Sequence, residues 1–400
     1  MIFVETTIGN TASEQFIEIV ERKGKGHPDT ICDSVVEAIS IALNNEYLKT
    51  FGKILHYNID KALFSAGKVD KYFGGGKVLK PIELIIGDRA TIEVNKKKIK
   101  IDEIIVETTK KWFRENFRFI EPEKHIVFKN VLSHGSSQLR SIFESESKLI
   151  PANDTSAGVG FYPLTPTEKI VLDLEKYLNS ENFKNLYPET GEDVKIMALR
   201  KGDELNLTIA MPFIAELIHS EKEYFERKEK VTNVIKKYLR KYSGSFQINM
   251  QLNTLDEKGK GVKGVYLSLL GTSLEDADSG EVGRGNRVNG LISITRPMGM
   301  EASAGKNPVS HVGKIYNVFA HHLAKKIHQK NEGIKEVYVY IVSTIGKPIN
   351  QPEIITAKII PHKGVKTIDL SKKIVELIEK ELADMTHFCD ELRKGKYSVC

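Results

Sequence analysis

The stretch "ERKGKGHPDT", residues 21–30, places a histidine, a proline and an aspartate between basic residues and a long apolar pattern. Pro28 suits the first turn of a helix because its missing N–H would have no partner there, and Asp29 suits the positive helix end. The free N–H groups of a helix start also attract anions, so His27 and Asp29 could meet a phosphate and its metal ion. Taken alone, the stretch fits either a plain helix start or a phosphate site.

Four further loops carry charged residues among glycines, and each also fits an ordinary exposed loop or turn. Asp193 and Lys195 lie two residues apart at the start of an expected strand, so their side chains should share one face. Together the loops offer several carboxylates and at least three cations: Asp154, Asp193, Lys195, Glu275, Asp276, Asp278, Glu281, Arg284, Arg287 and Lys306. Carboxylates for Mg²⁺, several cations and a histidine are the groups that a polyphosphate substrate needs.

Standard nucleotide and hydrolase signatures are missing. The segment "GMEASAGKN" (299–307) has five residues between its glycines and Asn307 after its lysine, which excludes the usual P-loop. "GRGNRVNG" is not a dinucleotide fingerprint, and neither G-x-S-x-G nor H-E-x-x-H occurs. A catalytic triad and a dedicated zinc site are therefore not expected.

Composition describes an ordinary globular protein. The chain has 400 residues, 40% of them hydrophobic and 28% charged, which predicts two or three domains. The net charge of +6 fits a small polyanionic substrate, and without a concentrated basic stripe we expect no nucleic-acid partner. Scattered cysteines predict no disulfide and a cytoplasmic location, and without an apolar run of membrane length we expect no membrane partner.

Amphipathic helices should alternate with strand pairs that position these loops. Thr165 and Glu168 have the spacing of a capping box at the start of one helix. The helical pattern occurs at 28–51, 101–117, 165–178, 221–242, 312–329 and 367–392. Strand pairs followed by helices recur about three times, so we expect three α+β units, each with a sheet covered by helices.

Five stretches together resemble one known family. They are "ERKGKGHPD", "NDTSAGVGFYPL", "GEDVKIMALR", "GRGNRVNGLI" and "AGKNPVSHVGKIYNV", in this order from residue 21 to about 318. They resemble S-adenosylmethionine synthetase (methionine adenosyltransferase), specifically its archaeal branch. The resemblance implies an α+β fold of three similar domains with pseudo-threefold symmetry and antiparallel or mixed sheets. It also implies a homodimer whose active sites lie in the subunit interface.

The expected units are discontinuous in sequence. The first combines 1–20 with 165–273, and the central one combines 21–130 with 303–320. The third, which includes active-site loops, combines 131–164, 274–302 and 321–400.

The family reaction accounts for the missing triad. The resemblance implies that methionine sulfur attacks the ribose 5′ carbon of ATP and expels tripolyphosphate, which is then hydrolysed to pyrophosphate and phosphate. A thioether has no proton to remove, so no general base is required, and alignment and cations dominate catalysis. ATP and L-methionine are the implied substrates, and Mg²⁺ and K⁺ the implied cofactors.

The resemblance also implies a role for each candidate residue. His27 would lie near the ribose 5′ oxygen, with Asp193 beside the ribose and Asp154 near the methionine ammonium. Asp29 and Asp278 would bind Mg²⁺. The phosphates would be bound by Lys195, Arg284 and Lys306. The segment "SHGSSQ" falls where archaeal members have a loop assigned to ATP, which makes candidates of His134, Gly135, Ser136, Ser137 and Gln138.

Three positions depart from the bacterial and eukaryotic pattern. Gly285 and Ser310 stand where that branch has lysines, and Val312 stands where it has a metal-binding aspartate. By proximity in sequence, the candidates to replace this charge are Arg287, Lys314 and His311.

Two other functions use similar residues. A phosphohydrolase or phosphotransferase with the same loops would turn over ATP or tripolyphosphate whether or not methionine is present. A nucleic-acid-binding protein would instead bind RNA in a salt-sensitive way, and only the basic pI near 8.8 favours it.

Overall fold

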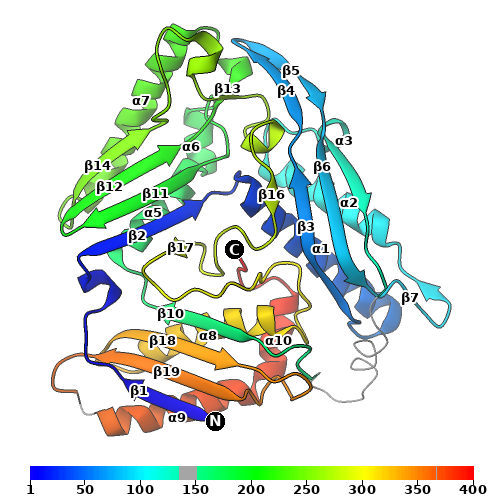
Figure 1. Ribbon diagram of the computed structural model, residues 1–400, viewed down its shortest axis with the longest axis vertical. Coiled ribbons are helices and arrows are strands. Elements are labelled where there is room, and N and C mark those ends of the chain that lie inside the picture. Colours follow the sequence, from blue (N-terminus) through cyan, green and yellow to red (C-terminus); the bar gives the residue numbers. More distant parts are fainter. Residues whose placement is uncertain (135–150, 366) are drawn as a thin grey trace.

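The computed structural model describes residues 1–134, 151–365 and 367–400 (Figure 1). Three large sheets surround the centre of the molecule, where the segment that follows β16 (Gly280–Glu281) and the C-terminal end lie. Helices cover the sheets. No helix in these described ranges is long and apolar enough to cross a membrane.

Each sheet has the same order of strand directions. The first consists of β14 (Gln247–Leu252), β12 (Glu204–Ala210), β11 (Lys195–Lys201), β2 (Ile17–Lys23) and β17 (Ile292–Ser293). The second consists of β9 (Ile126–Asn130), β6 (Ile82–Ala90), β3 (Tyr57–Ser65) and β16. The third consists of β1 (Ile2–Thr6), β19 (Ile354–Pro361), β18 (Ile334–Val342) and β10 (Ala157–Tyr162). In each sheet the first-named strand is parallel to its neighbour and the other pairs are antiparallel, which confirms the predicted α+β class with mixed sheets.

The helices repeat in the same way. One helix precedes the central antiparallel pair of each sheet: α1 (Pro28–Phe51), α5 (Pro166–Leu178) and α8 (Val312–Lys330). Another follows that pair: α2 (Ile101–Asn116), α7 (Glu221–Leu239) and α9 (Thr367–Ala383). The parallel edge strand comes next in two units, whereas in the third unit the start of the chain supplies it as β1. The three expected units are therefore visible as a repeated element order.

Smaller elements complete the described part of the chain. The helices are α3 (Pro122–His125), α6 (Glu181–Leu186) and α10 (Met385–Arg393). The strands are β4 (Lys68–Tyr72), β5 (Gly75–Lys80), β7 (Glu93–Val94), β8 (Lys97–Lys98), β13 (Phe213–Ile214) and β15 (Leu267–Ser268).

Three segments lie elsewhere than the expected unit bounds place them. Residues 274–302, expected in the third unit, supply β16 to the second sheet and β17 to the first. Within 1–20, β1 pairs with β19 of the third sheet rather than with strands from 165–273. Within 303–320, the start of α8 belongs to a helix that packs against β10 and β18, also in the third sheet. The physical reason is strand exchange. β2 precedes α1 but joins the first sheet, and β10 precedes α5 but joins the third sheet. Local sequence patterns do not reveal such a partner.

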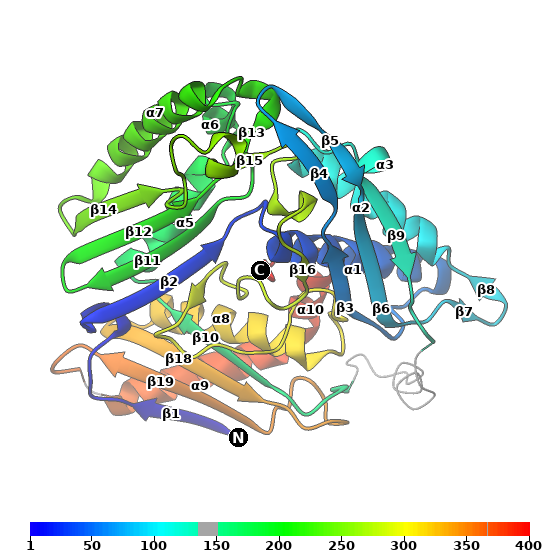
Figure 2. The same cartoon turned by 45° about the horizontal axis from the view of Figure 1, so that its top comes forward.

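Helix starts follow their local chemistry. His27 caps α1, Pro28 takes its first position, and Gly52 ends it with a φ of +74°. The Thr165 hydroxyl accepts from the Glu168 N–H at 3.1 Å, and the Glu168 carboxylate accepts from the Thr165 N–H at 2.7 Å, so the predicted capping box is confirmed. Figure 2 shows β2 running between β11 and β17 toward the start of α1.

Candidate functional site

Several of the predicted residues meet where β2 ends and α1 begins. Nδ1 of His27 accepts a hydrogen bond from the Asp29 N–H at 3.2 Å, and both side chains are largely buried. The approach depends on Gly26, because a Cβ there would collide with the backbone of Glu192 and Asp193. The loop that precedes α1 is therefore held directly against the segment that leads into β11.

His27 is a neutral hydrogen-bond donor at physiological pH. Burial, together with the charges of Lys23 and Lys195, lowers the pKa of His27 to about 4 against the opposing effect of Asp29. Because Nδ1 accepts a hydrogen bond, we assign the proton to Nε2. An N–H donor is thus available at the helix start without a change of protonation.

Asp29 connects the helix start to the Gly-rich loop after β16. One carboxylate oxygen accepts from the Glu281 N–H at 3.0 Å, and the other pairs with the Lys23 ammonium at 2.8 Å. The same ammonium donates to the carbonyl of Arg284 at 2.7 Å. Sequence reasoning missed Lys23, because the sequence alone does not show that Lys23 is the register partner of Lys195.

Lys195 and Asp193 lie beside this point in different environments. The Lys195 side chain is 44% exposed and pairs with Glu21 at 3.2 Å. Asp193 is buried and accepts from the Ser273 N–H at 2.9 Å and from its hydroxyl at 2.5 Å. Because β11 begins at Lys195, Asp193 precedes the strand, and its N–H bonds to the Gly271 carbonyl instead of a ladder partner. The alternation of side chains along a strand therefore does not determine where Asp193 points, although a shared strand face with Lys195 was expected on that basis.

Asp278 and Arg284 are the exposed members of this group. The Asp278 N–H donates to the Ser273 carbonyl at 3.0 Å, and its charge adds to the effect of burial that raises the pKa of Asp193 to about 6. Arg284 is 71% exposed and lies 3.9 Å from the Glu281 carboxylate. We call this group the α1-start cluster; its members are His27, Asp29, Asp193, Lys195, Asp278, Arg284 and Lys23.

Lys306 lies in a second group, which we call the β3-start cluster and define as Lys306, Asp60 and Glu301. Lys306 is 1% exposed and pairs with Asp60 and, at 2.8 Å, with Glu301. The Lys306 backbone forms a β-bridge with Asn58, near the start of β3. The loop that carries Asp278 and Arg284 instead pairs through β16 with Phe64, near the other end of β3. Six residues of strand span roughly 20 Å. One chain therefore does not bring Lys306 to His27.

The remaining predicted residues lie around residues 135–150. Asp154 is exposed, its carboxylate accepts from the Thr155 N–H at 2.7 Å, and its carbonyl accepts from Ser343 at 2.9 Å. His134 is exposed and follows Ser133, which bridges to Arg89. The other candidates of this segment lie outside the described residues: Gly135, Ser136, Ser137 and Gln138.

The three charges suggested as replacements have other partners. Arg287 donates to the carbonyls of Gly283 and Gly285 at 2.6 and 2.8 Å and to that of Gly299 at 3.1 Å. Lys314 is fully buried against Glu37 at 2.6 Å. His311 caps α8 as His27 caps α1, with Nδ1 accepting from Gly313, and burial lowers its pKa to about 3.

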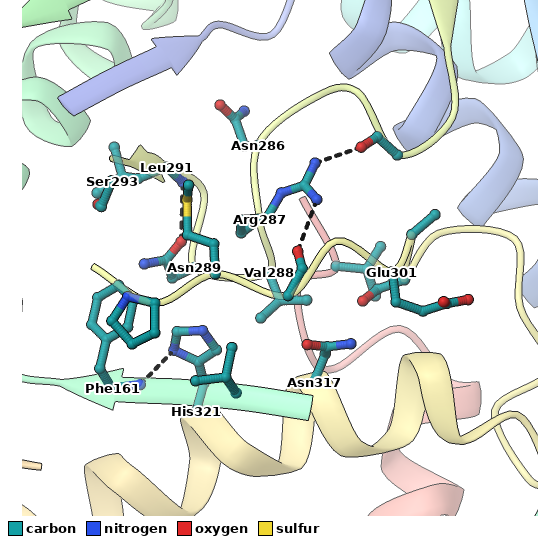
Figure 3. A pocket seen from close by; sticks show the side chains of 18 of the residues that line it. Phe161, Asn286, Arg287, Val288, Asn289, Leu291, Ser293, Glu301, Asn317 and His321 are labelled. Atoms are coloured by element: carbon teal, nitrogen blue, oxygen red, sulfur yellow. Dashed lines mark hydrogen bonds between the residues drawn. The ribbon is translucent and has the colours of Figure 1, made fainter. Parts of the chain in front are cut away.

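Arg287 also lines a small, partly open cavity at the centre of the molecule (Figure 3). Asn317 and His321 of α8 face it from one side, and Val288 and Asn289 from another. Its volume of about 20 Å³ is enough for about one water molecule. The cavity is therefore not a nucleotide site, and the open α1-start cluster is the stronger candidate.

Comparison with known proteins decides the family. The model of the family described as S-adenosylmethionine synthetase (AdoMet synthetase) matches residues 1–396. The chain belongs to the S-adenosylmethionine synthetase family. S-adenosylmethionine synthase of Caldivirga maquilingensis is 44% identical, over 95% of this chain and 94% of the relative. That of Pyrococcus furiosus is 42% identical, over 100% of this chain and 99% of the relative.

A solved structure shows the same fold. It is described as an unusual S-adenosylmethionine synthetase from Campylobacter jejuni, with a TM-score of 0.57, 16% identity, and coverage of 92% of this chain and 89% of that one. Family membership and the archaeal relatives make the chain a methionine adenosyltransferase that synthesises S-adenosylmethionine. The resemblance carried by the five sequence stretches is thereby confirmed.

Proposed function

We propose that the α1-start cluster binds the triphosphate of ATP while methionine sulfur attacks the ribose 5′ carbon. The released tripolyphosphate is then hydrolysed to pyrophosphate and phosphate before it leaves. The observation that carries this proposal is the meeting of a neutral histidine, the half-exposed Lys195 and an exposed arginine around the start of α1. These groups are donors and cations in place before charge develops on the leaving group, which is how electrostatic catalysis lowers a barrier.

His27 and Asp193 would orient the nucleotide. Nε2–H of His27 would donate to the ribose 5′ oxygen as its bond to carbon breaks, and the low pKa of His27 means that this donor is a neutral imidazole. Asp193 would accept from ribose hydroxyls, while Asp154 would pair with the methionine ammonium. Lys195 and Arg284 would contact the phosphates, with Lys306 as a further phosphate contact. The segment 134–138 would contact ATP.

The carboxylates fit a metal ion shared with the substrate. The described residues contain no group of three or more His, Cys, Asp or Glu side chains that could hold a metal ion. Mg²⁺ instead uses one or two carboxylates together with substrate phosphates, a role open to Asp29 and Asp278. Such an ion would neutralise charge on the triphosphate. K⁺ is proposed as a second cofactor on the family resemblance, and a cytoplasmic location on the unpaired cysteines.

Asp193 gives a pH-dependent prediction. Its pKa is about 6 in the folded protein against an ordinary value of 3.8, so the folded state favours the protonated form. The associated stability is fully present below about pH 4 and is lost as the pH rises through 6, by about 2–3 kcal/mol. Melting temperatures of the ligand-free protein and Asp193→Asn, measured from pH 4 to 8, should therefore shift in the variant's favour by pH 7. A difference that is independent of pH would contradict this.

A second copy of the chain would complete the site. Lys306 lies apart from the α1-start cluster in one chain, and the segment of Asp154 lies on the Lys306 side, since the Asn153 N–H donates to the Ser310 carbonyl at 3.2 Å. We therefore propose a homodimer in which each site takes this cluster from one subunit and Asp154 from the other. Exposed Asp154 and half-exposed Lys195 can both be changed without loss of core packing.

Mixed dimers test this proposal. Lys195→Met and Asp154→Asn chains with different tags are expressed together and the mixed dimers are isolated. Each variant alone should be nearly inactive, whereas each mixed dimer contains one intact site and should recover about half of the wild-type rate per dimer. Mixed dimers as inactive as the parents would show that both residues act within one chain.

A further inference from the structure

Lys23, at the end of β2, has contacts that the proposed roles leave unused. Its ammonium lies 2.8 Å from Asp29 and 2.7 Å from the Arg284 carbonyl, and its side chain is 16% exposed. We propose that Lys23 is a further triphosphate-binding residue, which exchanges its ion pair with Asp29 for a phosphate contact when Asp29 takes up Mg²⁺. This inference rests on the proposed function of the α1-start cluster.

The backbone of Lys23 is held from two sides. Its N–H donates to the Asn286 side chain at 3.0 Å, and its carbonyl accepts from Asn286 and from the Thr30 hydroxyl, each at 2.8 Å. These contacts join β2 to α1 and to the Gly-rich loop. The ammonium therefore starts from a fixed point between the elements that would surround the triphosphate.

The arrangement of charge favours an anion beside Lys23. Lys23 and Lys195 are register partners on adjacent antiparallel strands, so their Cβ atoms lie about 5 Å apart on one face. Like charges so placed repel each other, and an anion between them removes the repulsion. In the structure described, Asp29 balances one of the two charges and Glu21 the other.

The neighbouring loop supplies no cation at Gly285. A Cβ at that position would lie 2.5 Å from a carboxylate oxygen of buried Asp33, so a side chain there would require Asp33 or the loop to shift. Lys23 reaches the same loop from β2 and contacts it at Arg284. Lys23 thus provides a charge beside Gly285, a position at which the loop has no side chain.

Tripolyphosphate binding tests the assignment without turnover of ATP. Calorimetry compares wild type, Lys23→Met and Lys23→Arg, with and without Mg²⁺. The matched control is Lys228→Met, because Lys228 is 18% exposed and also pairs with one aspartate, Asp256, and one carbonyl, that of Asn253, both at 2.8 Å. It lies on α7, outside the cluster.

With Mg²⁺ we expect Lys23→Met to bind tripolyphosphate about 10- to 100-fold more weakly, while Lys23→Arg stays near wild type and Lys228→Met is unchanged. Without Mg²⁺ the loss should be smaller, because Lys23 remains paired with Asp29. Wild-type binding by Lys23→Met, or equal weakening with and without Mg²⁺, would overturn the inference. Lys195→Met is measured in parallel: if it also binds normally, the proposed site itself is wrong.

Discussion

Lys195→Met is expected to lower the rate of S-adenosylmethionine synthesis by about 10²- to 10³-fold while the protein remains folded. Lys195 opens β11 beside the start of α1, and its half-exposed ammonium is free to turn toward a triphosphate. Removing one positioned charge from a developing anion accounts for the loss. The surface pair with Glu21 contributes about 0–1 kcal/mol to folding, so the melting temperature should hardly change.

Initial rates at saturating ATP and methionine, together with thermal melting, measure both parts of this prediction. The control is Lys201→Met, an exposed lysine at the other end of the same strand, which should keep the wild-type rate. If Lys195→Met turned over at the wild-type rate, Lys195 would not contact the leaving group and the α1-start cluster would lose its principal cation.

Arg296→Met is expected to destabilise the fold by about 3–5 kcal/mol. The Arg296 side chain is buried and donates to Glu168 at 3.0 Å, to Glu336 at 2.9 Å and to the Pro163 carbonyl at 2.9 Å. Glu168 belongs to α5, Glu336 belongs to β18 of the third sheet, and Pro163 lies in the loop between β10 and α5. Without the guanidinium, two carboxylates would remain buried without their cation.

Denaturant unfolding or thermal melting tests this at pH 7. Arg114→Met is the control, because Arg114 is half-exposed and pairs with the half-exposed Glu123, and its loss should cost less than about 1 kcal/mol. Adding Glu336→Gln to Arg296→Met should recover part of the loss by removing one unpaired charge. Unchanged stability in Arg296→Met would mean that this network does not hold the units together.

The sequence predicted what local chemistry determines. Pro28, Asp29 and Gly52 suffice to delimit α1, and the Thr165–Glu168 spacing suffices for a capping box, because each acts through groups within one turn. The family was predicted from residue types in short loops, and the full-length match confirms it. The loops named as candidates include the ones that form the α1-start cluster.

Other features depend on contacts between distant segments. Nothing near residues 2–6 indicates that β1 pairs with residues 355–359, because these residues could form the same backbone hydrogen bonds with any sheet edge of similar polarity. Lys23 was missed because its position matters only once β2 pairs with β11. Lys306 was grouped with His27 on residue type, whereas β3 separates their clusters. Proximity in sequence likewise suggested Arg287 as a replacement for a missing lysine, whereas its guanidinium donates to carbonyls of its own loop.

Product analysis tests the central claim most directly. Purified protein is incubated with ATP, Mg²⁺ and K⁺, with and without methionine, and S-adenosylmethionine, pyrophosphate and phosphate are followed together by mass spectrometry. Sulfur attack with loss of the whole triphosphate predicts equal amounts of all three products, formed only when methionine is present. Release of phosphate at the same rate without methionine, and without S-adenosylmethionine, would contradict it.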